Sequence, residues 1–313
     1  MSRPQSASHE AYDAETAGQL DLVQGLILRP GARDIAPFIS FANGHLSAMA
    51  RRLVADCRSH RRVGLITGAY MAGAPRPAAE TDGPVGVAAL AAALVAVGGR
   101  PIVITDDPCA VVTQACLDRL GVECDLVSLP VDSPGDAIVE RVDGLGLAHL
   151  IAVERLGPNV DGKVMTMGAM DVTEHTAPLH VVVESASIPT SAIGDGGNEI
   201  GMGNVPVDVI AGSVEHGTSI ACTARVDDLV VAGTSNWGCY GAIACLAILV
   251  PEHAGALQLL LQPDTDREVV EAATAAGGID GVTGHPGESV DGVAIRNYWG
   301  LLRSLSDLAG GSH

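Results

Sequence analysis

Short apolar runs alternate along the chain with longer segments that place apolar residues at helical spacing. Four of these runs are predicted to be buried strands, at residues 63–68, 101–105, 122–129 and 148–153. The segments around them are predicted to be helices, at residues 43–58, 85–97, 108–120 and 134–142, with Asp107 as the cap of the third. Strands separated by helices of this length predict βαβ units, and therefore a predominantly parallel, Rossmann-like sheet with helices on both faces.

The second half of the chain continues this α/β pattern less regularly. Residues 179–183, 189–193 and 228–232 are strand candidates, and residues 237–250 are predicted to be a helix followed by two or three more. Neither an internal repeat nor a convincing linker interrupts the chain. We therefore expect a flexible N-terminus over residues 1–18 and a single α/β catalytic domain over residues 19–313.

Four polar, glycine-rich loops follow predicted strands, at residues 68–86, 154–168, 194–203 and 233–238. In an open parallel sheet, ligands bind in the crevice beyond the carboxyl ends of the strands. Because all four loops start at such ends, the sequence predicts that they converge on one site.

The first loop ends in Glu80-Thr81-Asp82-Gly83-Pro84, which opens the next predicted helix. Helix capping by Asp82, with Pro84 in the first turn, is a sufficient explanation for Thr81 and Asp82. Capping leaves Glu80 unexplained, so Glu80 is a candidate for acid or base chemistry.

The second loop begins with Glu154 and Arg155 directly after a predicted strand. One interpretation is a surface ion pair followed by two tight turns. The other makes Glu154 an acid/base group or metal ligand and lets Arg155 bind a carboxylate with two parallel hydrogen bonds.

The third loop combines glycines with acids in Asp195-Gly196-Gly197-Asn198-Glu199. The backbone N–H groups of Gly196 and Gly197 could converge on an anion. Oxygen atoms of Asp195, Asn198 and Glu199 could instead coordinate Mg²⁺ or Mn²⁺. As a bare pattern, the stretch favours a strand–turn–helix corner capped by Asp195 over either binding role.

The fourth loop carries Ser235, Asn236 and Trp237 at the start of a predicted helix. Ser235 or Asn236 can cap that helix, and Trp237 can either form the wall of a pocket or pack in the core. His149 lies within a predicted strand and is expected to be a core residue.

Charge and composition exclude several classes of function. The net charge is −19, from 18 basic and 37 acidic residues, and such a field repels nucleic acid and anionic membrane surfaces. Lys163 is the only lysine, which excludes a P-loop lysine elsewhere and argues against a Schiff base to pyridoxal phosphate. The expected partner is therefore a small molecule, and homo-oligomerisation stays open.

The seven cysteines are scattered and contain no C-x-x-C pair, which is typical of a reducing compartment. The N-terminus lacks the apolar core of a signal peptide, and no apolar run reaches the length of about 18 residues that a membrane span needs. We therefore expect a cytoplasmic protein.

Six stretches together resemble a known family: LITG, ETDGPVG, HLIAVERLGPNVDG, AIGDGGNEIGMGNV, VVAGTSNWGCYG and DGVTGHPGESVDGV. They are similar to motifs of the glutamate cyclase C-terminal-domain family, the catalytic module of D-glutamate cyclase, here in a stand-alone form. The resemblance covers residues 40–310. The chain departs from it in a longer segment at residues 70–79 and at Arg225 and Asp227, on the edge of the expected pocket.

The resemblance implies a hydro-lyase that dehydrates D-glutamate to 5-oxo-D-proline by attack of the amine on the γ-carboxyl group. Glu154 or Glu199 would then be the base, and Arg155 would bind the α-carboxylate. Asp195 and Asn198 would bind the ammonium group or a divalent ion, and the N–H groups of Gly196 and Gly197 would stabilise the oxyanion. The expected catalytic residues are Glu80, Asp82, Glu154, Asp195 and Glu199, the expected substrate-binding residues are Thr81, Gly83, Arg155, Gly196, Gly197, Asn198, Ser235, Asn236 and Trp237, and the metal candidates are Asp195, Asn198 and Glu199.

Other classes of function remain open at this point. One is a metal-dependent enzyme, with Mg or Mn, that acts on another amino-dicarboxylate or a lactam. Another is a module that binds an amino acid or a nucleotide without turning it over. If Glu199 is the base, Glu199→Gln abolishes turnover and spares the fold.

Overall fold

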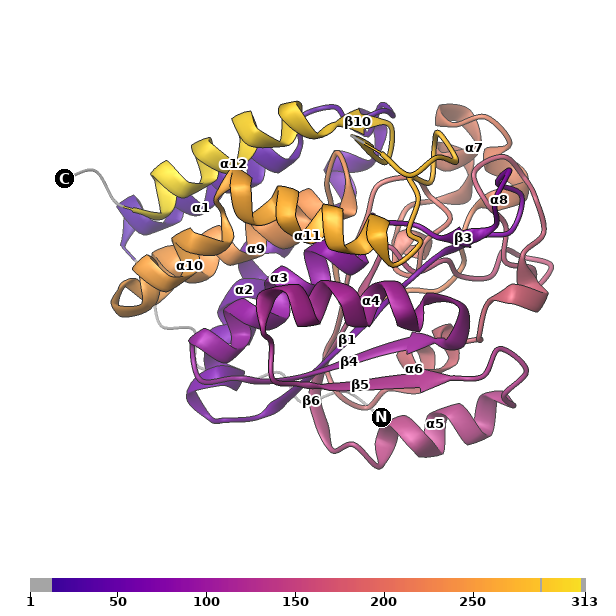
Figure 1. The fold of residues 1–313 in the computed structure, drawn as a ribbon, viewed down its shortest axis with the longest axis horizontal. Coiled ribbons are helices and arrows are strands. Elements are labelled where there is room, and N and C mark those ends of the chain that lie inside the picture. Colours follow the sequence, from indigo (N-terminus) through magenta and orange to yellow (C-terminus); the bar gives the residue numbers. More distant parts are fainter. Residues whose placement is uncertain (1–12, 288, 311–313) are drawn as a thin grey trace.

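The apolar runs pair into one sheet of six parallel strands (Figure 1). The computed structural model describes residues 13–287 and 289–310. The strands lie in the order β5-β4-β1-β6-β7-β8. Their bounds are β1 Arg62–Thr67, β4 Arg100–Asp106, β5 Asp125–Leu129, β6 Leu147–Val153, β7 Thr190–Gly194 and β8 Asp228–Val231. This is the strand order of a doubly wound sheet, so the predicted parallel, Rossmann-like α/β fold is confirmed.

Successive residues of the central strands face two separate apolar layers. In β1, Leu65 belongs to one buried cluster and Ile66 to the other. The same alternation places Ile151 and Ala152 of β6 in opposite layers. Burial on both faces explains why these strands read as continuous apolar runs in the sequence.

One face of the sheet is covered by a thick layer of helices around α9 (Ser235–Leu249). Fourteen of the fifteen residues of α9 are buried, because α1, α2, α3, α10 and α12 pack around it. The helices of this layer are α1 Ala14–Ile27, α2 His45–Arg58, α3 Pro84–Ala96, α4 Asp107–Leu120, α10 Ala254–Leu260, α11 Pro263–Ala275 and α12 Ile295–Ala309. A helix enclosed in this way needs no polar face, so α9 is apolar all round.

No single helix within residues 13–287 and 289–310 is long and apolar enough to cross a membrane. The segments Ser235–Leu249 and Pro251–Leu260 pass the length and composition test only as a pair, and that pair is bent by 112°.

The opposite face carries shorter elements, which pack over the second apolar cluster. These elements are η1 Ala36–Phe41, α5 Gly135–Asp143, α6 His180–Ser185, α7 Val207–Ser213 and α8 Gly217–Ile220. The remaining 3₁₀ turns are η2 Thr173–His175, η3 Met202–Asn204 and η4 Pro251–His253. Helices therefore lie on both faces, as the sequence predicts.

Several predicted element assignments are wrong in detail. The strand predicted at residues 179–183 is helix α6, because this apolar segment lies beside α5 as part of the helical layer. Asp107 does not cap α4; Asp106 is the N-cap residue, and the Asp107 carboxylate accepts a hydrogen bond of 2.5 Å from Ser128 Oγ. Helix α1 begins at Ala14, so the expected boundary at residue 18 falls inside a helix, and residues 1–12 lie outside the described part.

Two short antiparallel hairpins were not predicted. One pairs β2 (Tyr70–Met71) with β3 (Ala78–Ala79), and the other pairs β9 (Ser289–Val290) with β10 (Val293–Ala294). Each strand has two residues, which is too short for an alternating pattern to be visible in the sequence.

Replacement of Gly201 tests how closely the loop at residues 194–203 packs against the sheet. Its φ is +100°, and a Cβ atom there would lie 2.3 Å from the Cβ of Ala192 in β7. We expect Gly201→Ala to lower the free energy of unfolding by about 3 kcal/mol, since overpacking adds to left-handed strain. Gly121→Ala is the matched control, because φ is +61° there and nothing lies within 4 Å, so it costs about 1 kcal/mol. Urea denaturation measures both, and equal losses would contradict the packing.

Candidate active site

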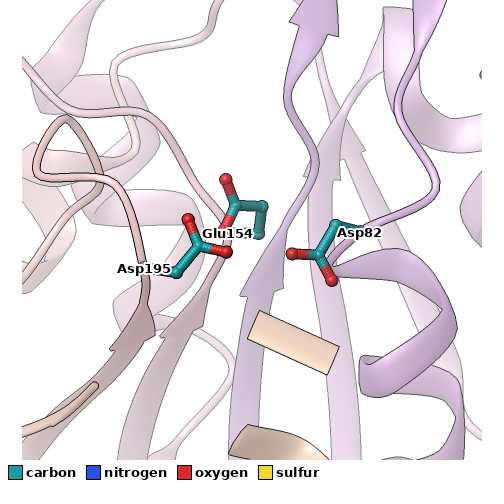
Figure 2. Close-up of side chains that lie close together, drawn as sticks. All are labelled: Asp82, Glu154 and Asp195. Atoms are coloured by element: carbon teal, nitrogen blue, oxygen red, sulfur yellow. The ribbon is translucent and has the colours of Figure 1, made fainter. Parts of the chain in front are cut away.

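The centre of the sheet contains a switch point between β1 and β6. From β1 the chain crosses to β4 on one side, and from β6 it crosses to β7 on the other. Connections that leave in opposite directions open a crevice at the carboxyl ends of these strands, where doubly wound proteins bind ligands. Loops after β1, β6 and β7 bring carboxylates to this crevice (Figure 2).

Asp82, Glu154 and Asp195 form a carboxylate trio at this point. One oxygen from each of the three side chains lies within 4.8 Å of the others. Figure 2 shows the three carboxylates pointing toward one another from separate segments. Asp82 and Asp195 are each 1% exposed and Glu154 is 7% exposed, so the trio is buried. The structure therefore brings together three of the predicted catalytic residues.

Asp82 is held by an exchange of caps between two helices. Its carboxylate accepts hydrogen bonds from the backbone N–H groups of Ser235 (2.9 Å) and Asn236 (2.8 Å), at the start of α9. In return, Asn236 Oδ1 accepts hydrogen bonds from the N–H groups of Gly83 (2.9 Å) and Gly86 (2.7 Å), at the start of α3. The prediction that Asp82 caps the helix that follows it, α3, is therefore wrong. Asp82 accepts hydrogen bonds from the N-terminus of α9, and Asn236 accepts those from the N-terminus of α3.

The predicted cap of α9 is also wrong. Thr234 is the N-cap residue, and its side chain accepts a hydrogen bond from Trp237 N–H. Ser235 uses its hydroxyl elsewhere: Ser235 Oγ donates to Glu154 Oε2 at 2.5 Å. Ser235 Oγ therefore holds the Glu154 carboxylate, and the N–H groups of Ser235 and Asn236 hold the Asp82 carboxylate.

Glu154 has an unusual backbone conformation, with φ at +43° directly after β6. Such a φ costs a non-glycine residue about 1–3 kcal/mol and is found at sites where the surrounding structure enforces it. Here it places the Glu154 side chain in the lining of the cavity. This strain supports a functional role for Glu154.

Glu199 fills the anion-binding nest that the sequence predicts. Its Oε1 accepts hydrogen bonds from the N–H groups of Asp195 (3.2 Å) and Gly196 (2.7 Å), and its Oε2 accepts one from Gly197 N–H (2.8 Å). The two glycine amides are therefore already satisfied by Glu199, and they are not available to a substrate oxyanion.

The predicted metal set is only partly assembled. Asp195 belongs to the trio, but Glu199 binds the backbone instead, and Asn198 Nδ2 donates to Met165 O at 2.8 Å. Asn198 does line the cavity. The oxygen-rich position involves Asp82 and Glu154 in place of Asn198 and Glu199.

Arg155 is not brought to the cavity. Its guanidinium is 1% exposed and pairs with Asp106 Oδ2 at 2.6 Å. It also donates to Gly68 O (2.8 Å) and Ala177 O (2.6 Å). These contacts connect the ends of β4 and β1 with the segment before α6, which is a structural role.

Arg33 is a member of the site that the sequence analysis missed. Its Nη1 lies 2.8 Å from Asp195 Oδ1 and 2.7 Å from Asp291 Oδ2. Arg33 belongs to the segment between α1 and η1, and Asp291 to the turn of the β9–β10 hairpin. The Asp291-Gly292 pair is a hairpin signal that could have placed this turn. The stretch around Arg33 has no periodicity that could have placed it.

Thr81, Gly83 and Trp237 stabilise the loops around the trio. Thr81 N–H donates to Ile279 O at 2.9 Å, and Gly83 N–H donates to Asn236. Trp237 is 4% exposed and packs edge-on against Tyr298, with ring centroids 5.4 Å apart. None of the three lines the cavity, so their substrate-binding roles stay predictions.

A cavity of about 560 Å³ reaches the trio at Glu154, whereas Asp82 and Asp195 are buried behind its lining. Its polar lining includes Arg33, Glu80, Glu154 and Asn198. Its apolar lining includes Met71, Leu156, Met167, Met170 and Val282. The volume is within the range of small-molecule sites, which are mostly apolar with a few convergent polar groups.

The buried carboxyl groups disfavour each other's ionisation. Burial, followed by repulsion from neighbouring carboxylates, raises the pKa of Glu80, Glu154 and Asp195 well above the usual range. Burial and the charge of Asp291 raise the pKa of Asp82 to about 7. Within the described residues, Glu80 Oε1 and Asp195 Oδ2 have no hydrogen-bond partner. Such a cluster is suited to protons, an ammonium group or a metal ion.

The contacts of Glu199 change what its replacement is expected to do. In Glu199→Gln, an amide NH₂ group replaces one acceptor and faces backbone N–H donors. We expect a loss of about 2 kcal/mol or more in the free energy of unfolding, because buried donors lose their partners. Thermal unfolding measures this, with the exposed Glu252→Gln as control. Unchanged stability of Glu199→Gln would contradict the filled nest.

Comparisons with known proteins identify the family of the chain. The family model described as D-glutamate cyclase-like, C-terminal, matches residues 23–306. Human D-glutamate cyclase, mitochondrial, is 36% identical over 119 residues, which are 37% of this chain and only 18% of that protein. The crystal structure of RecJ in complex with Mn²⁺ from Thermus thermophilus aligns with 95% of this chain and 39% of that chain, at 11% identity and a TM-score of 0.33. Since the family match spans nearly the whole sequence, the chain belongs to the D-glutamate cyclase-like C-terminal family.

Proposed function

We propose that this protein is a hydro-lyase that dehydrates D-glutamate to 5-oxo-D-proline. The family and the name of the human relative point to cyclase chemistry. The observation that carries the proposal is the buried carboxylate trio at the switch point of the sheet, whose Glu154 lines a cavity of small-molecule size. The site combines a binding position for an ammonium group with several carboxyl groups able to move protons.

The reaction sets clear demands. The amine nitrogen attacks the γ-carboxyl carbon, a C–N bond forms, and one C–O bond breaks. Two of the three ammonium protons leave with that oxygen as water, so no net proton is taken up or released. The site must therefore remove protons from nitrogen and deliver them to a poor leaving group.

Glu154 and Glu80 meet these demands from the wall of the cavity. We assign Glu154 as the base that takes a proton from the ammonium group, because the hydrogen bond that Ser235 Oγ donates to Glu154 Oε2 favours the ionised carboxylate. Glu80 is the acid that protonates the departing oxygen, because burial raises its pKa and its Oε1 has no hydrogen-bond donor within the described residues to favour the ionised form. Asp82 and Asp195 attract the ammonium group. No covalent intermediate is required.

The trio also fits a divalent ion. Three carboxylate oxygens within 4.8 Å of one another are hard ligands of the kind that Mg²⁺ and Mn²⁺ prefer. Bound there, an ion would polarise the γ-carboxyl group. The same observation supports the second candidate, a metal-dependent enzyme acting on another amino-dicarboxylate or a lactam.

A nucleotide-binding module is less well supported. The amides of the glycine loop donate to Glu199 and cannot also bind a phosphate group. The carboxylates around the cavity repel such a ligand. A cytoplasmic location stays a prediction, and the name of the human relative places that protein in mitochondria.

Glu154→Gln tests the assigned base. We expect kcat/KM for D-glutamate to fall by about 10²–10⁴-fold, because the amide cannot accept the ammonium proton. Purified protein is incubated with D-glutamate, and 5-oxoproline is detected by chiral chromatography. The control is Glu184→Gln, an exposed glutamate in α6. Activity in Glu154→Gln within about threefold of the control would refute the assignment.

Manganese binding tests the trio as a cation site. We expect Mn²⁺ at about 100 times its Kd to stabilise the protein by about 2.7 kcal/mol, because only the folded chain assembles the ligands. Asp195→Asn removes this gain, whereas Asp161→Asn, at an exposed position, keeps it. Differential scanning calorimetry measures the shift. No shift in the wild-type protein would leave the ammonium group as the occupant.

A further inference from the structure

Arg33 is the cationic residue in the lining of the cavity. Every other described lining residue is neutral or acidic, with Glu80 and Glu154 as the acids. Of the other basic residues on these loops, Arg155 is buried against Asp106 and Lys163 pairs with Asp171 at 3.0 Å, while Arg76, next to the lining residue Pro75, is exposed and does not line the cavity itself. Any anionic group of a ligand in this cavity therefore finds its positive partner at Arg33.

Two hydrogen bonds from Nη1 fix the orientation of the Arg33 guanidinium. Nη1 donates to Asp195 Oδ1 and to Asp291 Oδ2, at 2.8 and 2.7 Å. Within residues 13–287 and 289–310, both side-chain hydrogen bonds of Arg33 come from Nη1, and the side chain is 20% exposed in the lining of the cavity. An arginine with Nη1 fixed in this way retains Nε–H and Nη2–H on one edge, which matches the two oxygens of a carboxylate.

The two carboxyl groups of a substrate such as glutamate differ in what they need. The γ-carboxyl group reacts and has to lose its negative charge. The α-carboxylate keeps its charge from substrate to product, so a permanently charged guanidinium suits it. Asp195 contacts Arg33 and also belongs to the trio, so a carboxylate on Arg33 lies next to the position that attracts the ammonium group. An α-amino acid carries these two groups on the same carbon atom.

We propose that Arg33 binds the α-carboxylate of the substrate through Nε and Nη2, with Asp291 as a positioning residue. The site then selects α-amino dicarboxylates over ω-amino acids that lack the α-carboxylate. This assignment rests on the proposed function for the identity of its ligand.

The test compares D-glutamate with 4-aminobutyrate, which has the same amine and γ-carboxyl group but no α-carboxylate. Isothermal titration calorimetry measures the binding of each ligand to Glu154→Gln, which is expected not to convert D-glutamate, and to the same protein with Arg33→Gln or Arg33→Lys added. We expect Arg33→Gln to weaken D-glutamate binding by about 10–100-fold, the value of a hydrogen-bonded ion pair, and 4-aminobutyrate binding by less than about threefold. Arg33→Lys keeps the positive charge but loses the paired N–H donors of the guanidinium, so its effect on D-glutamate binding is intermediate.

The control is Arg141→Gln, an exposed arginine in α5 away from the cavity, which should change neither affinity. Thermal unfolding of each variant reports whether it folds. An equal loss for both ligands in the folded Arg33 variants would show a purely structural role and overturn the proposal. A parent protein with Arg33 intact that does not prefer D-glutamate to 4-aminobutyrate would also overturn it. A preference that depends on Arg33, together with no turnover of D-glutamate by the wild-type protein, would support the proposal and refute the cyclase function.

Discussion

Six buried carboxyl groups and one guanidinium meet at the carboxyl end of this sheet, and the surrounding structure is organised around that excess of negative charge. An uncompensated buried charge costs several kcal/mol, so each carboxyl group needs donors, a proton or a cation. Backbone amides surround Glu199, the start of α9 holds Asp82, and Arg33 joins Asp195 to Asp291. Glu80 and Glu154 have the least compensation and line the cavity. These two carboxyl groups therefore still need a cation or protons. The cyclisation of an amino-dicarboxylate involves both, an ammonium group and proton transfer.

The geometry of the cluster depends on how α3 and α9 begin. Asp82 and Asn236 exchange caps between the two helices, so the loop after β1 cannot move without breaking hydrogen bonds at both N-termini. Helix α9 is enclosed by other helices and gives these bonds a rigid base. A functional group supported by packed elements keeps its position better than one on a free loop. This explains why a site made of loop residues can hold like charges close together.

The sequence predicts the sheet and five of the six carboxyl groups of the cluster, all except Asp291, because both depend on local patterns. Polar loops follow the apolar runs, and such loops contain Glu80, Asp82, Glu154, Asp195 and Glu199. Side-chain direction is not visible in a sequence, so the adjacent Glu154 and Arg155 were assigned to the same site although Arg155 binds Asp106. Arg33 lies 162 residues from Asp195 and 258 from Asp291, and no local pattern encodes contacts of that separation. The nest of Gly196 and Gly197 was recognised, but its anion is Glu199 of the same loop.

The most direct test of the central claim is a crystal structure of Glu154→Gln, which is expected to bind substrate without converting it, grown with D-glutamate. We expect one D-glutamate molecule in the cavity, with its ammonium nitrogen about 3 Å from an oxygen of Asp82 or Asp195. Its γ-carboxyl group should face Glu80. Density for D-glutamate at a different place, or an ammonium group directed away from the carboxylate trio, would contradict it.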